Sequence, residues 1–169
     1  QSGALFSSLN VLENVLYVLH EYATVSYDMQ LELAKLKIVM SGLELDAAYK
    51  YPAELSGGMR KRAGLARALV MRPEIVLFDE PTTGLDPLMA KAIHELITTM
   101  QRTFGFTAVM VSHEIPEIFF LSDYVAILKQ GRIAVMAPPA EFIRTTDPEI
   151  QEFISVGGPV VLSGAAASS

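Results

Sequence analysis

Apolar residues recur at helical spacing through most of the first hundred positions. Leucine and valine return every three or four residues from Leu9 to Glu21, which predicts a helix whose start Asn10 and Glu13 would stabilise. Similar patterns predict helices over residues 29–40, 56–71 and 88–103, with Gly42 and Gly105 as stops after the first and last of these. The first part of the chain is therefore predicted to be mainly helical.

Two short apolar runs break this helical pattern. Ile75–Phe78 and Thr107–Val111 are continuous, short and rich in β-branched residues, which predicts strands buried on both faces, as in a parallel sheet. Further along, the sequence predicts a helix over 115–121, a hairpin of 124–128 and 132–136 around Gln130-Gly131, and short helices over 140–144 and 148–155. Helices followed by alternating strands and helices predict an α/β domain with a helical segment in front.

Composition narrows the function classes. The 169 residues are 51% apolar and 19% charged, against about 25% charged in a typical domain, which excludes a disordered chain. A net charge of −6 argues against general affinity for nucleic acid. With no cysteine, there is no disulfide framework, thiolate zinc site or thiol nucleophile. No apolar run is long enough for a membrane span and no secretory signal is present, so we expect a soluble, cytosolic chain.

A glycine pair stands at the start of one predicted helix. Ser56 precedes Gly57 and Gly58, and two glycines let backbone N–H groups approach a ligand closely. A helix N-terminus with bare amides binds anions, phosphate above all. An ordinary serine cap would give the same pattern, so both interpretations stand at this point.

Two carboxylates end the first predicted strand. Asp79 and Glu80 follow its four apolar residues, at the sheet edge where open α/β sheets bind ligands. Asp79 is placed to hold Mg²⁺, and Glu80 to polarise an attacking water as a general base. A merely solvated strand end would leave two repelling charges without a cation, so the magnesium interpretation is favoured.

Two further residues stand where strands and helices meet. Asp86 comes just before Pro87 at the start of a predicted helix, which is a common capping arrangement. His113 follows the second predicted strand. If the two strands end side by side, His113 comes close to Glu80, although a histidine at a strand end is more often structural.

In this order, these motifs resemble the nucleotide-binding subunit of ABC transporters. They are Leu-Ser-Gly-Gly, an apolar strand ending Asp-Glu-Pro, Gly-Leu-Asp, and a strand followed by Ser-His, and the resemblance extends from Gln1 to about Ser155. It implies the C-terminal part of a P-loop NTPase domain, with ATP and Mg²⁺ as cofactors. It also implies a second nucleotide-binding subunit and transmembrane permease subunits as partners, and a peripheral location on the cytoplasmic face of the inner membrane.

The resemblance assigns a role to each motif residue. Gln1 would sense Mg²⁺ and the attacking water at the start of a loop, Gln1–Phe6, that contacts the membrane subunits. Ser56, Gly57 and Gly58 would bind the γ-phosphate held by the other subunit, and Asp79 would serve Mg²⁺. Glu80 would be the general base and His113 the γ-phosphate switch, while Asp86 would lie in a loop that communicates across the dimer.

The resemblance also implies domain limits and a missing part. We expect a helical subdomain over about 6–72 that carries the signature motif, the remaining catalytic core over 73–155, and a flexible tail over 156–169. In the family, a Gly-rich phosphate loop and an adenine-stacking aromatic residue lie upstream of the glutamine, and neither occurs here. We therefore expect an N-terminally truncated domain that is inactive alone and exposes apolar surface on Ile75–Phe78 and Thr107–Val111.

Within the family, local details resemble the Mla-type branch, which maintains outer-membrane lipid asymmetry. They are Gln-Ser-Gly-Ala-Leu-Phe at 1–6, Met59 after the glycines, Ser-His-Glu-Ile-Pro-Glu at 112–117 and Asp-Pro-Glu-Ile-Gln-Glu-Phe at 147–153. Phospholipid is the cargo this implies. Chromosome-maintenance, repair and translation-factor ATPases share the signature and the carboxylate pair, and a non-catalytic binding module is a further alternative. Chromosome-type ATPases carry a long coiled coil, which the 54 residues before Leu55 do not contain.

Overall fold

The computed structural model describes residues 3–156, apart from the side chains at positions 115, 116, 149, 153 and 156. The chain divides into two compact units, Gln1–Val111 and Ser112–Ser169, each of which is described by itself. The predicted tail over 156–169 lies almost wholly outside the described residues. The predicted boundary near residue 72 falls within the first unit and stays a prediction.

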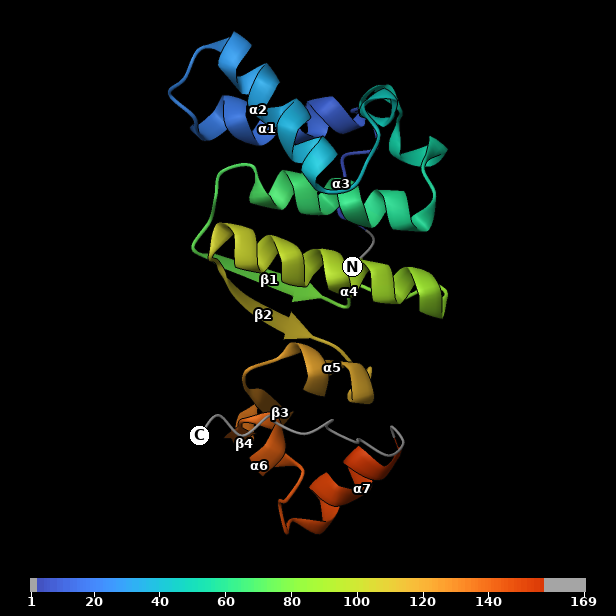
Figure 1. The fold of residues 1–169 in the computed structure, drawn as a ribbon, viewed down its shortest axis with the longest axis vertical. Coiled ribbons are helices and arrows are strands. Elements are labelled where there is room, and N and C mark those ends of the chain that lie inside the picture. The colour runs from blue at the N-terminus through green and yellow to red at the C-terminus, as the bar shows by residue number, and fades with distance from the viewer. Residues whose placement is uncertain (1–2, 157–169) are drawn as a thin grey trace, which may run out of the picture. The chain divides into compact units, whose positions relative to one another are not determined.

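The first unit begins with helices and continues into a two-stranded sheet (Figure 1). Its elements are α1 (Val11–Tyr22), α2 (Tyr27–Met40), the 3-10 helices η1 (Leu45–Tyr49) and η2 (Pro52–Glu54), α3 (Gly57–Leu69), β1 (Ile75–Asp79), α4 (Pro87–Phe104) and β2 (Thr107–Val111). Capping explains several of these limits. Asn10 and Glu13 form a reciprocal capping box at the start of α1, and Gly105 ends α4 in the left-handed conformation, with φ of 72°.

Two apolar cores lie in this unit, and α3 contributes to both. Ala63 and Ala66 of α3 are buried with residues of α1 and α2, among them Val15. Leu65 and Leu69 of the same helix are buried instead with residues of β1 and α4. At 3.6 residues per turn these two pairs fall on different sides of the helix, so α3 separates the helical part of the unit from the sheet.

The sheet consists of β1 and β2, which pair in parallel with Asp79 opposite Val111. The prediction that both strands are buried on both faces is wrong. Val76 is buried in the core shared with α4, whereas Leu77 is 76% exposed and Val111 60% exposed. The expectation that these strands expose apolar surface is confirmed, because α4 covers one face and no described element of this unit covers Leu77.

The second unit consists of a hairpin and short helices. Its elements are α5 (Ile115–Leu121), β3 (Val125–Lys129), β4 (Arg132–Ala137), α6 (Pro139–Phe142) and α7 (Pro148–Val156). The predicted turn at Gln130-Gly131 is confirmed by φ angles of 47° and 75°, since positive values at both central residues are typical of a tight hairpin turn. Phe119 and Phe142 pack edge to face at 5.5 Å in the core of this unit.

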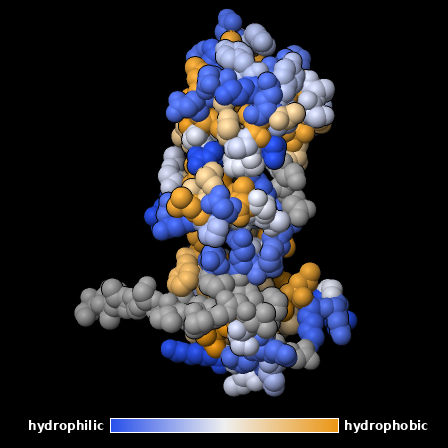
Figure 2. Space-filling model, turned by 90° about the vertical axis from the view of Figure 1, so that its right-hand side faces the viewer, coloured by the Kyte–Doolittle hydropathy of each residue, from blue (hydrophilic) through white to orange (hydrophobic). Residues whose placement is uncertain are grey.

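Surface hydropathy is mixed rather than uniformly apolar. The helical end of the first unit, at the top of Figure 2, is mainly hydrophilic with a few apolar residues among the polar ones. Among residues 3–156, no helix combines the length and the apolar character that a membrane crossing would require.

Candidate nucleotide site

The glycine pair begins α3 as predicted. Ser56 is the N-cap, and its Oγ accepts a hydrogen bond from the Met59 backbone N–H at 3.2 Å. A Cβ on Gly57 would lie 3.3 Å from the Leu85 side chain, and one on Gly58 would lie 2.5 Å from Met89. The glycines therefore permit a close approach between the start of α3 and the segment that follows β1.

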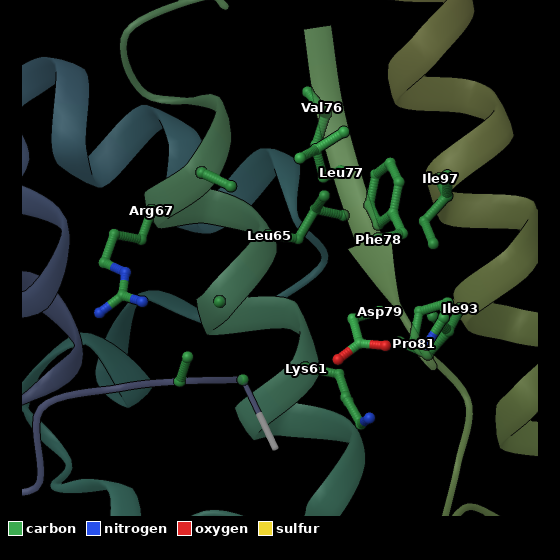
Figure 3. A pocket seen from close by; sticks show the side chains of 14 residues that line it. Lys61, Leu65, Arg67, Val76, Leu77, Phe78, Asp79, Pro81, Ile93 and Ile97 are labelled. Carbon is green, nitrogen blue, oxygen red and sulfur yellow. The ribbon is translucent and has the colours of Figure 1, made fainter. Parts of the chain in front are cut away.

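The two predicted carboxylates lie at the C-terminal end of β1. Asp79 is the last residue of the strand, and its carboxylate points into a cavity in Figure 3. Glu80 comes next with φ of 47°, a left-handed conformation that costs a non-glycine residue about 1 kcal/mol or more and is concentrated at functional sites. The chain thus turns sharply between the two acids.

Neighbouring groups hold Glu80 in this conformation. Its backbone N–H donates to the Val111 carbonyl on β2 at 3.0 Å. The Thr83 hydroxyl donates to Glu80 Oε2 at 2.9 Å, which fixes one carboxylate oxygen. The Lys61 ammonium donates to the Glu80 carbonyl oxygen at 3.1 Å. These partners come from β2, the turn after β1, and α3.

The cavity beside Asp79 has a volume of about 250 Å³. Its polar side chains are Asp79, Lys61 and Arg67, and the apolar lining comes mainly from β1, α3 and α4. In Figure 3 the Lys61 amino group lies near the Asp79 carboxylate, close to the end of β1. The side chains that line the cavity are therefore apolar, apart from one acidic and two basic groups.

Asp79 fits a magnesium ion of the kind that accompanies a nucleotide. Within residues 3–156, no group of three or more histidine, aspartate, glutamate or cysteine side chains converges as a protein-only metal site. Mg²⁺ with nucleotides takes one or two protein carboxylates and completes its shell with phosphate and water oxygens. A single exposed carboxylate at a strand end meets that requirement.

Asp86 has the capping role that the sequence predicts. Its Oδ1 accepts hydrogen bonds from the backbone N–H groups of Leu88 at 3.1 Å and Met89 at 3.0 Å. Because Met89 also faces Gly58, the start of α4 lies against the start of α3. Communication across a dimer stays a prediction.

Two predicted site residues lie outside this arrangement. Gln1 falls outside the described residues. His113 follows β2 by two residues and belongs to the second unit. The ends of β1 and β2 are adjacent as predicted, while the proximity of His113 to Glu80 stays a prediction.

The loop before α1 is fixed by a residue that we did not predict. Asn14 is fully buried, accepts a hydrogen bond from the Phe6 N–H at 2.8 Å, and donates to the Phe6 and Leu9 carbonyls at 3.1 and 2.9 Å. The guanidinium carbon of Arg67, on α3, lies 5.4 Å from the centroid of the Phe6 ring. Burial lowers the pKa of this guanidinium. A polar residue within an apolar helix pattern was the signal available for Asn14.

The same loop crosses α3 at a small residue. A Cβ on Gly64 would lie 2.7 Å from the Gly3 carbonyl oxygen, and a Cβ on Gly3 would lie 2.6 Å from the Arg60 carbonyl oxygen. These are contacts between backbones, which cannot move aside as flexible side chains can. Gly3 and Gly64 therefore allow the loop to lie directly on the helix that carries the glycine pair.

A serine-capped glycine pair lies beside a parallel strand that ends at Asp79 and leads into Glu80, and this arrangement is the one expected of a P-loop NTPase domain. The sequence profile of the family described as "ABC transporter" matches residues 1–83. The chain is similar in sequence and in fold to ABC transporter ATP-binding proteins.

Similar proteins include two sequences named "intermembrane phospholipid transport system ATP-binding protein MlaF". The chain is 36% identical to the one from Escherichia coli K12 over 162 residues, which is 95% of this chain and 60% of that protein. For Haemophilus influenzae MlaF the identity is 32%, covering 95% and 61%. It is also 34% identical to the "probable ribonucleotide transport ATP-binding protein mkl" of Mycobacterium tuberculosis H37Rv, covering 96% and 46%. The chain thus spans about 60% of the length of the MlaF relatives.

Solved structures share the fold. The dimeric post-hydrolysis ATP-binding cassette MJ0796, bound to ADP and Pi, matches with a TM-score of 0.71 and 31% identity over 82% of this chain and 60% of that one. The cbiO1 structure from Clostridium perfringens, part of the transporter complex cbiONQ, matches with a TM-score of 0.73 and 30% identity, covering 82% and 54%.

Proposed function

We propose that this chain is part of an ATP-hydrolysing subunit that energises phospholipid transport across a cell envelope. The observation that carries the proposal is a contact within one chain, between the glycine turn and the segment that follows the two acids. The glycine turn that begins α3 lies against Leu85 and Met89, which come after β1 and the acids Asp79 and Glu80 at its end.

In this proposal Glu80 is the general base. Its carboxylate is held by Thr83 at 2.9 Å, and a base must be fixed within reach of the water that it deprotonates. Asp79 would hold Mg²⁺, which would supply charge neutralisation at the phosphates. Gln1 and His113 would position the water and the γ-phosphate beside Glu80.

The partner subunit completes each site. Two subunits would face each other head to tail, so that Ser56, Gly57 and Gly58 of one contact the nucleotide bound by the other. Backbone N–H groups at the start of α3 suit that contact. The dimeric state of MJ0796 supports a pair of this kind, with Asp86 near the contact between subunits.

The membrane partners, the location and the cargo are proposed from the names of the relatives. The MlaF proteins are named for phospholipid transport, which supports permease subunits as partners and a peripheral position on the cytoplasmic face of the inner membrane. The predicted loop Gln1–Phe6 would be the contact with those subunits. Its described part is held to α1 by Asn14 and lies against α3 at Gly64. The mkl protein is named for ribonucleotide transport rather than for phospholipid transport. The identity of the cargo therefore needs a test of its own.

The test uses the complete ATPase that carries this chain together with a phosphate loop. Glu80→Gln should reduce ATP hydrolysis by at least about 100-fold and yield an ATP-bound dimer on size-exclusion chromatography. Glu74→Gln makes the same substitution on an exposed residue just before β1 and should leave both measurements unchanged. Full activity in the Glu80 variant, or a monomer at saturating ATP, would refute the assignment.

Two additional measurements separate activity from cargo. The 169-residue chain by itself should show no ATPase activity above background, because most phosphate contacts in the family come from the phosphate loop. The transporter assembled in vesicles should hydrolyse ATP faster with added phosphatidylglycerol and phosphatidylethanolamine than with added ribonucleotides. The reverse order would overturn the phospholipid assignment while leaving the ATPase assignment intact.

A further inference from the structure

The turn after β1 is connected to α3 by one side chain. Lys61 lies in the second turn of α3, three residues after Gly58, and its ammonium donates to the Glu80 carbonyl oxygen at 3.1 Å. The same oxygen accepts the Thr83 N–H only at 3.4 Å. The lysine therefore provides the shorter of these two hydrogen bonds to a carbonyl 19 residues away in sequence.

This contact acts at a point of backbone strain. Glu80 has φ of 47°, and a left-handed residue other than glycine persists only where its surroundings hold it there. Its N–H is held by Val111 and its carboxylate by Thr83. Without Lys61, the carbonyl would lose the shorter of these two hydrogen bonds, and the direction of the Glu80 side chain would be less well defined.

Because Lys61 belongs to α3, its contact connects the Glu80 carbonyl to the start of that helix. Ser56 and Gly57 begin the same helix, so a shift of the helix start is transmitted along one rigid element to the Lys61 ammonium. Lys61 also lines the cavity that Asp79 enters, where an ammonium reduces the repulsion between the two neighbouring acids.

We infer that Lys61 is a positioning residue that links the phosphate-contacting start of α3 to the general base Glu80. The inference rests on the proposed function, in which the start of α3 contacts one nucleotide while Glu80 of the same chain acts on the other. Lys61 thus couples the two nucleotide sites of the dimer through a single backbone carbonyl.

The activity test compares three variants of the complete ATPase. Lys61→Met keeps the length of the stem and removes the donor, and should lower kcat by about 10- to 100-fold while the KM for ATP stays within about twofold. Lys61→Arg restores a donor and should keep kcat within about threefold of wild type. Lys91→Met removes a lysine from an exposed site on α4 and should leave kcat unchanged.

Hydrogen exchange gives a readout that does not depend on hydrolysis. In the nucleotide-free protein, Lys61→Met should raise the exchange rate of the Glu80 and Thr83 amides by about tenfold, whereas Lys61→Arg and Lys91→Met should leave it within about twofold. Should Lys61→Met fail to fold, Lys61→Gln replaces it and should shift both measurements in the same direction.

Three results would overturn the inference. They are an unchanged kcat in Lys61→Met, an equal loss in Lys61→Met and Lys61→Arg, and a loss of kcat without faster exchange at Glu80 and Thr83. Failure of the proposed function would look different. The wild-type protein would then lack ATPase activity, or Glu80→Gln would retain it, while the exchange measurement would still report on the Lys61 contact.

Discussion

Replacing Asn14 by alanine removes the polar group that fixes the loop over residues 3–9. The side-chain oxygen accepts a short hydrogen bond from the Phe6 N–H and a long one, at 3.5 Å, from Arg67. Its two amide hydrogens serve the carbonyls of Phe6, Leu9 and Asn10. Because two hydrogens are shared among three carbonyls, about three hydrogen bonds are lost, each with a net contribution of about 1 kcal/mol. We expect Asn14→Ala to lower the free energy of unfolding by about 3 kcal/mol.

Asn10→Ala is the matched control for this prediction. Asn10 lies one turn earlier, on the exposed end of α1, and its Oδ1 accepts the Glu13 N–H at 2.9 Å. Loss of an exposed N-cap of this kind costs about 1 kcal/mol. Both substitutions shorten the same residue type at the same helix, so the difference between them isolates burial and the number of hydrogen bonds.

Urea unfolding followed by far-UV circular dichroism measures the difference, with the protein dilute enough to suppress association. With a slope of about 1.5 kcal/mol per molar urea, Asn14→Ala should move the midpoint down by about 2 M and Asn10→Ala by about 0.7 M. Midpoints that agree within about 0.3 M would refute the reasoning, since burial and bond number at Asn14 would then add nothing over an exposed cap.

Three other predictions follow from the first unit. Gly64→Ala should lower stability by about 1–3 kcal/mol in a thermal melt, because the added methyl group meets the backbone of Gly3 at 2.7 Å; an unchanged Tm would contradict that contact. Leu77→Thr with Val109→Thr should reduce self-association of the 169-residue chain in sedimentation velocity, since both side chains are exposed on the sheet, while changing stability by less than about 1 kcal/mol. Burial lowers the pKa of Lys37 below its ordinary 10.5, so the unfolded chain binds more protons between the two values and stability rises with pH through that window. Lys37→Met should flatten this rise in urea titrations between pH 8 and 10.5, and a persisting slope would point to another group.

Local signals in the sequence predicted most of the elements. The capped start of α1 at Asn10 and the glycine stop at Gly105 depend on residues adjacent to the helices that they limit, so both could be predicted from the sequence. The carboxylate pair was predictable for the same reason, because Asp79 ends a strand of recognisable length and Glu80 directly follows it.

Contacts between distant residues were not predictable. Burial of a strand depends on what covers it, and apolar composition alone could not show that Leu77 would be 76% exposed. The contact of Lys61 with the Glu80 carbonyl joins residues 19 apart, and Arg67 contacts Asn14 across 53 residues at 3.5 Å. Such pairs arise from how α3 packs, and the sequence of α3 carries no local mark of its partners.

The division of α3 between two cores has a consequence for how the first unit unfolds. Ala63 and Ala66 are buried on one side of the helix, and Leu65 and Leu69 on another. If either core opens, α3 loses the packing on that side, and helices of about 13 residues are marginal in water without tertiary packing. Opening of one core therefore weakens the other, and the two apolar clusters should lose their structure in one cooperative transition.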